Sequence, residues 1–256
     1  MWKMWCAPSA RLLVTLQTRL HSTRTVILGQ EIMISKAQVT PQLRAWCGEF
    51  GHEYTQRSCL TPEQVDALWE KNFGTTRTEL NRRFLANIPA GARILEVGCN
   101  TGNQLLLLQR LGYCNLYGIE VQDCALEIAR SRMNHVKLTV ASAFALPFED
   151  KYFDLVFTSG VLIHVSPNDL PLALDEIHRC AKNYVWGCEY YASNVTEINY
   201  RGHSELLWKM DYAKEYLARF DDLELVSEQR LSYIENQNVD SMFLLRKVAR
   251  AQGSSR

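Results

Sequence analysis

Residues 94–104 read ILEVGCNTGNQ, an apolar run that contains an acid and leads into a turn with two glycines. The apolar run is typical of a buried strand, and the leucine-rich segment from about Asn103 is typical of a helix. Gly98 and Gly102 allow a ligand to approach the backbone closely, and the first turn of a helix has N–H groups without intrahelical partners. The stretch therefore predicts a strand, turn and helix that together hold a nucleotide.

Two kinds of nucleotide compete for such a turn. Dinucleotide-binding enzymes use G-x-G-x-x-G, in which a pyrophosphate rests on the helix N-terminus. Counting from Gly98, this chain has Asn100 at the third position and Asn103 at the sixth, so the pattern is missing. Glu96 precedes the first glycine by two residues and would repel a pyrophosphate, whereas it suits a ligand with a positive centre. A nicotinamide-dependent oxidoreductase is therefore disfavoured.

The pattern E-x-G-x-N-x-G resembles the first motif of class I S-adenosylmethionine-dependent methyltransferases, whose cofactor carries an ammonium and a sulfonium and no phosphate. Asn100 departs from the commoner glycine, but Asn is the non-glycine residue that best tolerates a left-handed backbone. The resemblance implies S-adenosylmethionine as the cofactor. The candidate cofactor residues in this motif are Glu96, Gly98, Cys99, Asn100 and Gly102.

Three further strands are expected after this motif, at residues 115–121, 136–142 and 154–159. The first ends near Glu120, about 20 residues after the glycine turn, where this architecture has an acid that accepts hydrogen bonds from ribose hydroxyls. The resemblance places the end of the second beside the adenine ring. Because ligands bind at the carboxyl ends of parallel strands, one crevice is predicted. Its further cofactor candidates are Glu120, Val121, Ser142, Ala143, Phe144 and Ser159.

The order of elements predicts an α/β fold: a doubly wound, Rossmann-like sheet of seven strands, mostly parallel with an antiparallel last strand, and N-terminal helices. Thr61, Pro62 and Gln64 predict a helix start with a capping box. Residues 33–90 are expected to form a helical segment that covers the active site. Residues 91–250 are expected to form the methyltransferase domain.

Residues 1–32 are expected to lie outside this fold as a disordered leader. The first 30 residues contain Lys and Arg and no acid, which is also typical of an organelle-targeting segment. A third interpretation is a mis-assigned start, because Gln30 and Glu31 can be encoded by the purine-rich ribosome-binding sequence CAGGAG. Met33 lies just after this sequence, and translation from Met33 is the favoured hypothesis.

The overall composition limits the classes of molecule that the protein is expected to bind. The chain has 256 residues, a formal net charge of zero and no basic run of five residues, which disfavours nucleic acid and favours a small-molecule substrate. It has no run of 18 apolar residues, so no membrane span is expected. The eight cysteines form no C-x-x-C pair, which predicts reduced thiols, no metal site and a cytoplasmic protein.

The candidate catalytic residues follow the fourth and fifth strands. His164 comes just after the fourth strand and is either a general base or a packing residue. Residues 188–212 crowd polar and aromatic groups together, which suits a hydroxylated, anionic substrate but is also typical of a solvated surface loop. Three aromatic residues at helical spacing either cover the cofactor or belong to the core: Trp46, Phe50 and Tyr54. The four candidates for catalysis are His164, Tyr191, Arg201 and His203.

A closer resemblance rests on WCGEFGHEYTQR (46–57), GVLIHVSPNDLP (160–171) and EYYASNVTEINYRGHSELLWKMDYA (189–213). With the glycine turn, these stretches resemble the methylases associated with pseudaminic acid biosynthesis, over about residues 45–246. The resemblance implies a bacterial cytoplasmic enzyme that methylates an oxygen or nitrogen of an amino-sugar or nonulosonate precursor for a surface glycan.

Two alternatives stay open. One is a methyltransferase for another small acid or a lipid-linked metabolite. The other is a module that binds S-adenosylmethionine without turnover, as a partner in a biosynthetic complex. The sequence indicates no oligomeric state.

Overall fold

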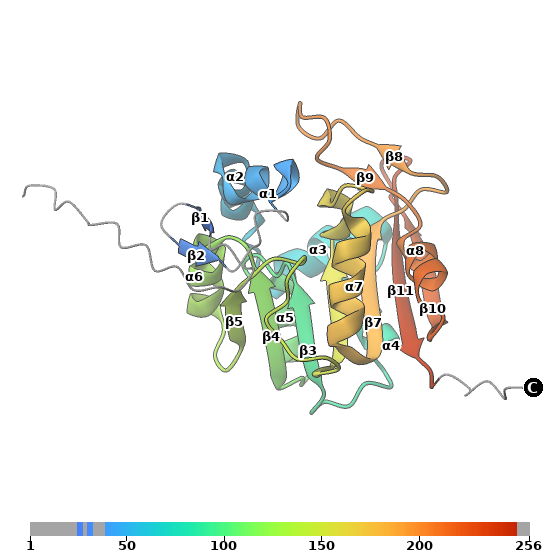
Figure 1. The fold of residues 1–256 in the computed structure, drawn as a ribbon. Coiled ribbons are helices and arrows are strands. Elements are labelled where there is room, and N and C mark those ends of the chain that lie inside the picture. The colour runs from blue at the N-terminus through green and yellow to red at the C-terminus, as the bar shows by residue number, and fades with distance from the viewer. Residues whose placement is uncertain (1–24, 28–29, 33–38, 250–256) are drawn as a thin grey trace, which may run out of the picture.

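The computed structural model describes residues 25–27, 30–32 and 39–249 of the chain, the first two segments as backbone only. Its centre is a seven-stranded sheet with the strand order β10-β11-β7-β6-β3-β4-β5 (Figure 1). The strands are β3 (Arg93–Val97), β4 (Asn115–Glu120), β5 (Lys137–Val140), β6 (Phe153–Ser159), β7 (Ala181–Tyr190), β10 (Leu223–Ser232) and β11 (Val239–Lys247).

Strand directions confirm the predicted fold class. β3 pairs in parallel with β4 and β6, and β7 pairs in parallel with β6. β11 lies antiparallel between β7 and β10, as expected for the last strand. Every residue of β3 after the first is buried, because a parallel strand in the middle of such a sheet is covered on both faces.

Helices cover both faces of the sheet (Figure 1). On one face α7 (Leu170–Cys180) and α8 (Tyr212–Arg219) pack against apolar side chains of β6, β7 and β11. On the other face lie α4 (Arg77–Phe84), α5 (Asn103–Arg110) and α6 (Asp123–Arg132). The sheet is therefore the middle of three layers. Because helices cover both of its faces, a ligand binds at the edge where the parallel strands end.

The segment before the sheet is helical, as predicted. Its helices are α1 (Pro41–Cys47), α2 (Glu49–Ser58), α3 (Pro62–Phe73) and α4. The capping box of α3 is present: the Thr61 hydroxyl accepts from the Gln64 N–H, and the Gln64 side chain accepts from the Thr61 N–H at 2.8 Å. α1 and α2 lie above the carboxyl ends of the strands (Figure 1).

A long connection joins β7 to α8, and we call residues 192–211 the roof loop. It contains the short antiparallel pair β8 (Thr196–Glu197) and β9 (Trp208–Lys209). It rises beyond the same end of the sheet as α1 and α2 (Figure 1). Two segments far apart in sequence therefore stand over one edge of the sheet.

The N-terminal hypotheses fall largely outside this description. The backbone of β1 (Thr25–Ile27) and β2 (Gln30–Ile32) forms a short antiparallel pair. Residues 1–24, and the hypothesis of a start at Met33, lie outside the described residues. Within the described part of the chain, no helix combines the length and apolarity that a membrane crossing requires.

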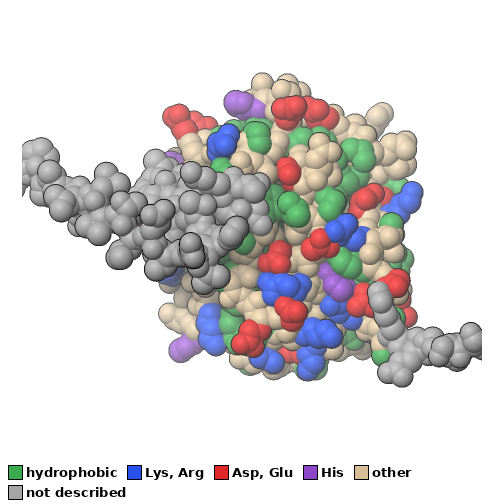
Figure 2. All heavy atoms as spheres, in the orientation of Figure 1, with side chains coloured by type: hydrophobic (Ala, Val, Ile, Leu, Met, Phe, Trp, Pro, Cys, Tyr) green, Lys and Arg blue, Asp and Glu red, His purple; other side chains and the backbone are tan. Residues whose placement is uncertain are grey.

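The distribution of charged side chains on the surface and the state of the cysteines are consistent with the composition. On the face drawn in Figure 2, acidic and basic side chains are interspersed. The cysteines in the described residues are free thiols, and Cys6 lies outside them.

Candidate active site

A cavity of about 500 Å³ is lined by residues at the carboxyl ends of β3, β4 and β6 and by residues of α1 and α2. Its volume is within the range of small-molecule sites, about 300 to 1,000 Å³. Twelve of the candidate residues line it: Glu96, Gly98, Cys99, Asn100, Glu120, Val121, Ser142, Ala143, Phe144, Ser159, His164 and Arg201. Three others lie outside the lining: Gly102, Tyr191 and His203.

The glycine turn connects β3 to α5 through three residues with positive φ. Gly98 has φ +74°, Asn100 has φ 44° and Gly102 has φ +79°. A Cβ atom on Gly98 would lie 2.6 Å from Cγ2 of Val161, so a side chain cannot fit there. Asn100 adopts the left-handed backbone that its residue type tolerates. Gly102 is the N-cap of α5 and shapes the turn without reaching the cavity.

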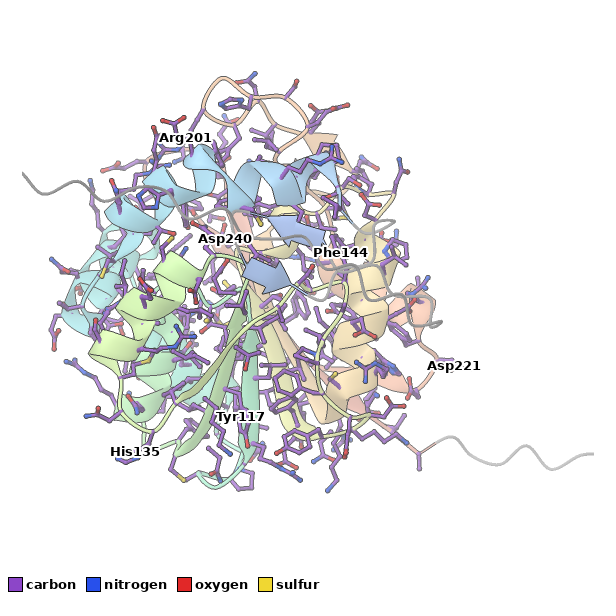
Figure 3. The ribbon with its side chains drawn as sticks, turned by 60° about the vertical axis from the view of Figure 1, so that its left-hand side comes forward. Tyr117, His135, Phe144, Arg201, Asp221 and Asp240 are labelled. Atoms are coloured by element: carbon purple, nitrogen blue, oxygen red, sulfur yellow. The ribbon has the colours of Figure 1, made fainter. Side chains whose placement is uncertain are left out.

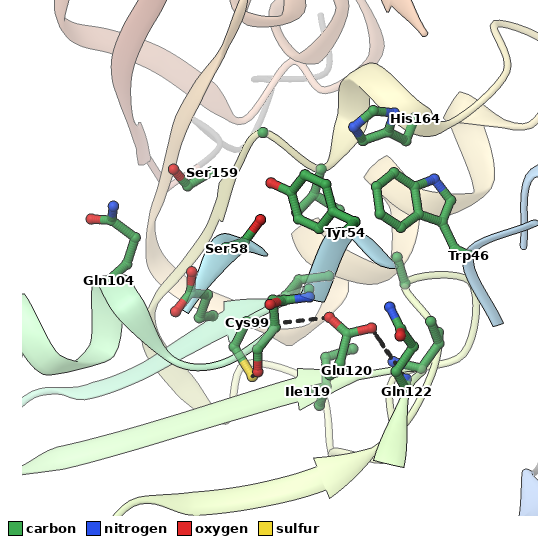
Figure 4. Close-up of a pocket in the computed structure, with 18 of the residues that line it drawn as sticks. Trp46, Tyr54, Ser58, Cys99, Gln104, Ile119, Glu120, Gln122, Ser159 and His164 are labelled. Atoms are coloured by element: carbon green, nitrogen blue, oxygen red, sulfur yellow. Dashed lines mark hydrogen bonds between the residues drawn. The ribbon is translucent and has the colours of Figure 1, made fainter. Parts of the chain in front are cut away.

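Glu120 is a buried carboxylate at the end of β4. Its Oε2 accepts from the N–H of Asn100 at 3.0 Å, and its Oε1 accepts from the N–H groups of Val121 at 2.7 Å and Gln122 at 3.2 Å (Figure 4). Burial raises the pKa of Glu120, and these N–H donors oppose the rise. With three of its roughly four acceptor sites occupied, the carboxylate still has one on Oε2 for a hydroxyl group of a ligand.

Other polar atoms on the cavity wall are buried without a hydrogen-bond partner among the described residues. Glu96 is 3 % exposed, and its Oε2 is one of them. The others are Oε1 of Gln42, Nε1 of Trp46, Oε1 of Gln104 and Nε2 of Gln122. Buried polar groups normally have hydrogen-bond partners, so these donors and acceptors are available to bind a polar ligand. Burial also raises the pKa of Glu96 well above its ordinary value.

Aromatic side chains from α1 and α2 form one wall of the cavity. The Trp46 ring lies 5.2 Å from Phe50 and 5.1 Å from Tyr54, both edge to face. The helical spacing of these residues is interrupted, because α1 ends at Cys47 and Gly48 separates it from α2. Trp46 and Tyr54 line the cavity, whereas Phe50 packs behind them. Figure 4 shows Tyr54 between Trp46 on one side and Ser58 on the other.

His164 closes the 3-10 turn η2 (Leu162–His164) that follows β6. Its Nδ1 lies 2.7 Å from the carbonyl oxygen of Leu206, and its ring lies 4.5 Å from the Trp46 ring. Because a carbonyl can only accept, Nδ1 carries the proton and Nε2 keeps a lone pair. Burial lowers the pKa of His164 to about 4, so the ring is neutral near pH 7.

A tight turn in the roof loop carries Arg201. Tyr200 and His203 exchange backbone hydrogen bonds of 2.8 and 3.0 Å, and the residues between them, Arg201 and Gly202, have φ of 54° and 86°. Positive φ at both central positions is the mark of a type I′ turn. Arg201 lines the cavity, while His203 packs on Phe50 at 5.4 Å.

The polar crowding of residues 188–212 does not converge on the cavity. Only Arg201 from this segment lines it. The Tyr191 ring lies 3.4 Å from the guanidinium carbon of Arg230, outside the cavity. Glu189 accepts from the N–H groups of Val161 at 3.0 Å and Ile163 at 3.4 Å, and burial raises its pKa to about 7. Glu189 therefore supports the loop after β6.

The cavity also contains residues that the sequence analysis missed. Gln122 follows Glu120 by two residues and Gln104 is the second residue of α5, so both lie next to the end or start of a predicted element. Arg57 and Trp69 lie on helices whose cavity-facing sides no sequence pattern revealed.

Comparison with known proteins agrees with this geometry. Residues 95–186 match the family model described as "Methyltransferase domain". The methyltransferase GfsG of Streptomyces halstedii is 30% identical over 114 residues, which are 42% of this chain and 40% of that protein. The O-methyltransferase rstn1 of Aspergillus nomiae is 32% identical over 124 residues, 46% of this chain and 53% of that protein. The chain thus spans about half the length of these curated relatives or less.

A solved structure shows the same fold. Geranyl diphosphate C-methyltransferase from Streptomyces coelicolor, solved with S-adenosyl-L-homocysteine, superimposes with a TM-score of 0.55 at 13% identity, over 67% of this chain and 77% of that one. The cavity wall suits such a ligand, since its buried carboxylate oxygens can accept hydrogen bonds from hydroxyl and ammonium groups. The matched domain and the fold therefore support a class I S-adenosylmethionine-dependent methyltransferase, with S-adenosylmethionine as the cofactor.

Proposed function

We propose that this protein transfers a methyl group to an oxygen or nitrogen of a small, anionic, sugar-like acceptor, as in the synthesis of nonulosonic (pseudaminic-type) acids or related surface glycans in the bacterial cytoplasm. The observation that carries the proposal is the position of Arg201. Arg201 lines the cavity from a turn with positive φ, and no carboxylate among the described residues forms an ion pair with it. An arginine in that state suits a carboxylate or phosphate.

Arg57 supports the same class of acceptor. It lines the cavity, lies 5.6 Å from the centre of the Tyr54 ring, and also has no acidic partner in the described part of the chain. Trp46 and Tyr54 offer aromatic faces on which the apolar side of a sugar-like ring can pack. Cationic and aromatic groups together therefore favour an anionic ring compound over an apolar acceptor.

In the proposed mechanism, S-adenosylmethionine supplies a methyl group that its sulfonium already activates. Glu120 would accept hydrogen bonds from ribose hydroxyls, and Glu96 would accept from the cofactor's ammonium. Trp46 and Tyr54 would exclude water, while Arg57 and Arg201 orient the acceptor. His164 would take the acceptor's proton on Nε2, the nitrogen that its bond to Leu206 leaves free.

A second candidate is methylation of a small carboxylic acid on its carboxylate oxygen. The low pKa of His164, about 4, favours it, because a base this weak removes a proton from an alcohol or ammonium poorly. A carboxylate carries no proton at neutral pH and needs no base.

Both candidates are tested by incubating the protein with methyl-labelled cofactor and one of two pools, nucleotide sugars with nonulosonates or simple carboxylic acids. Mass spectrometry then identifies the metabolite that gains a methyl. Label in a sugar acid supports the proposal, and label only in a simple acid supports the second candidate. Arg201→Gly provides the matched control, since glycine is compatible with the turn but carries no charge. Equal labelling by that variant would contradict the recognition of an anion by Arg201.

A further inference from the structure

Gln42 is a buried glutamine of α1 that lines the cavity and uses only half of its amide group. The side chain is 7 % exposed, and its Nε2 donates to the carbonyl oxygen of Glu205 at 2.9 Å. Because a carbonyl can only accept, this bond fixes the orientation of the amide. Oε1 of Gln42 is buried and has no hydrogen-bond partner among the described residues. The cavity wall therefore contains one oriented hydrogen-bond acceptor at this position.

Trp46 adds a hydrogen-bond donor next to it. Trp46 follows Gln42 by four residues, so both side chains lie on one face of α1. Its Nε1 is buried and also has no partner in the described part of the chain. The indole ring lies 5.1 Å from the Tyr54 ring and 4.5 Å from the His164 ring, which hold it in place. Since an indole N–H can only donate, this face of α1 carries one unused acceptor and one unused donor.

The roof loop joins Gln42 to the residues proposed to act on the methyl acceptor. The carbonyl of Glu205 binds Gln42, and the next carbonyl, that of Leu206, lies 2.7 Å from Nδ1 of His164. Arg201 precedes Glu205 by four residues in the same loop and lines the cavity. Figure 3 shows Arg201 next to the first helices of the chain. One loop therefore brings Gln42 together with the proposed base and the proposed anion-binding residue.

The side chains of α1 divide between the two parts of the cavity. Leu43 packs with Val121, just beyond the end of β4, where the ribose is proposed to bind. Gln42 and Trp46 lie on the neighbouring side of the helix. They contact the roof loop and His164 instead. The unused acceptor and donor therefore belong to the part of the cavity that is proposed to bind the methyl acceptor.

Together, these two atoms suit a ligand group that both donates and accepts a hydrogen bond. A hydroxyl or a secondary amide does both. The oxygens of a carboxylate or phosphate only accept, so Oε1 of Gln42 would repel them, and an ammonium would leave Nε1 of Trp46 unpaired. A buried polar atom without a partner weakens binding, so such a site discriminates against analogues that lack the matching group.

We propose that Gln42 determines specificity for the methyl acceptor: with Trp46, it binds a neutral hydroxyl or amide group, at a point separate from the anionic group bound by Arg201. This inference rests on the proposed function and narrows it to acceptors that carry both kinds of group. It disfavours a carboxylic acid with no other polar group, because such a ligand would bury Oε1 of Gln42 without a donor.

Two ring acids test this inference. D-glucuronate is a hydroxylated sugar acid, and tetrahydropyran-2-carboxylate has the same ring and carboxylate without hydroxyl groups. NMR titration of each into the full chain saturated with S-adenosylhomocysteine measures the affinities, and D-glucuronate should bind about tenfold or more tightly. Equal binding of the two acids would overturn this inference alone. If neither acid binds, the proposed anionic, sugar-like acceptor is refuted, and this inference fails with it.

Gln42→Met retains the length of the side chain and removes the amide. It should bind D-glucuronate about tenfold more weakly, and tetrahydropyran-2-carboxylate and S-adenosylhomocysteine within about twofold of the parent protein. Loss of the bond to Glu205 would not give this result, because a displaced roof loop would move Arg201 and weaken both acids. An equal loss for both acids would mean that Gln42 only supports the loop, and it would overturn the inference.

Trp46→Phe is an independent variant that removes the indole N–H and retains an aromatic ring. It should weaken D-glucuronate about threefold or more and leave tetrahydropyran-2-carboxylate within about twofold of the parent protein. An unchanged preference between the two acids would overturn the inference, whether or not Gln42→Met is stable enough to titrate.

Gln104→Met provides the matched control. Oε1 of Gln104 is also buried without a partner in the described residues, but Gln104 lies at the start of α5, beside the glycine turn. Figure 4 shows Gln104 and Trp46 on opposite sides of Tyr54. This variant should keep the parent protein's preference for D-glucuronate. If Gln104→Met loses that preference as Gln42→Met does, the effect is not specific to Gln42 and the inference fails.

Discussion

The carboxylate of Glu120 accepts a hydrogen bond from the backbone N–H of Asn100 at 3.0 Å. This bond ties the end of β4 to the glycine turn that follows β3. Asn100 extends the connection, since its Nδ2 donates to Oγ1 of Thr55 in α2 at 2.8 Å. The acid proposed to hold the ribose thus also fixes the shape of the turn and anchors the helix above it.

Glu120→Ala should weaken cofactor binding for two reasons, the loss of hydrogen bonds to ribose and the release of the turn. Each charge-assisted hydrogen bond contributes on the order of 1.5 to 3 kcal/mol. Calorimetry with S-adenosylhomocysteine measures the change. Asn100→Gly is the control for the connection to α2, because it keeps the backbone N–H that binds Glu120, tolerates the positive φ and removes only the side chain that binds Thr55. Unchanged affinity in Glu120→Ala would refute the ribose role.

Arg201→Gly should raise the KM for the acceptor found by labelling and leave cofactor affinity unchanged. It should also leave the protein equally or more stable, because a non-glycine residue with φ 54° carries strain of about 1 kcal/mol. Thermal denaturation and steady-state kinetics measure the two effects. A parallel loss of acceptor and cofactor binding would mean that Arg201 only holds the roof loop in place.

His164→Ala should lower kcat more than it lowers the binding of either substrate, because the base acts only in the chemical step. In the parent protein, kcat should fall only as the pH approaches about 4, where His164 takes up a proton. A pH profile of kcat for both proteins checks this. If His164→Ala keeps full activity at every pH, His164 packs against Trp46 and is not the base.

Asp240 should make the protein less stable as the pH rises. Burial raises its pKa from 3.8 to about 7, so between these values the folded state binds a proton that the unfolded state has lost. The favourable contribution is complete below about pH 4 and is lost as the pH passes 7, at about 1.4 kcal/mol for each pH unit within that window.

Urea denaturation at pH 5 and pH 8 measures the effect. Asp240→Asn should reduce the difference in unfolding free energy between the two pH values. Glu189, whose pKa is also raised to about 7, should leave part of the difference in place. An undiminished difference in Asp240→Asn would show that Asp240 stays ionised in the folded protein.

The cofactor side of the site could be predicted because its residues are consecutive or follow strand ends at a regular spacing. Glu96, Gly98 and Asn100 occupy one strand and turn, and Glu120 ends the next strand. Parallel strands bring these positions to one edge, so local patterns were sufficient. Trp46 and Tyr54 also line the cavity, although the helical spacing that suggested them is interrupted at Gly48.

The acceptor side could not be predicted in the same way. Successive residues of a strand point to opposite faces, so Glu189 and Tyr190 at the end of β7 point to different sides of the sheet, and Tyr191 lies beyond the strand. Glu189 supports the loop after β6, and Tyr191 packs against Arg230 on β10. Gln42 gave no signal at all, because nothing in a helix sequence shows that a side chain in its first turn binds a distant loop.

The ceiling of the cavity is a seam between two distant parts of the chain. Gln42 of α1 donates to the carbonyl oxygen of Glu205 at 2.9 Å, across 163 residues, and Phe50 of α2 packs on the turn that carries Arg201. Neither contact involves the strands of the central sheet. New acceptor preferences can therefore arise by exchanging residues along this seam, while the nucleoside floor and the folding of the sheet stay as they are.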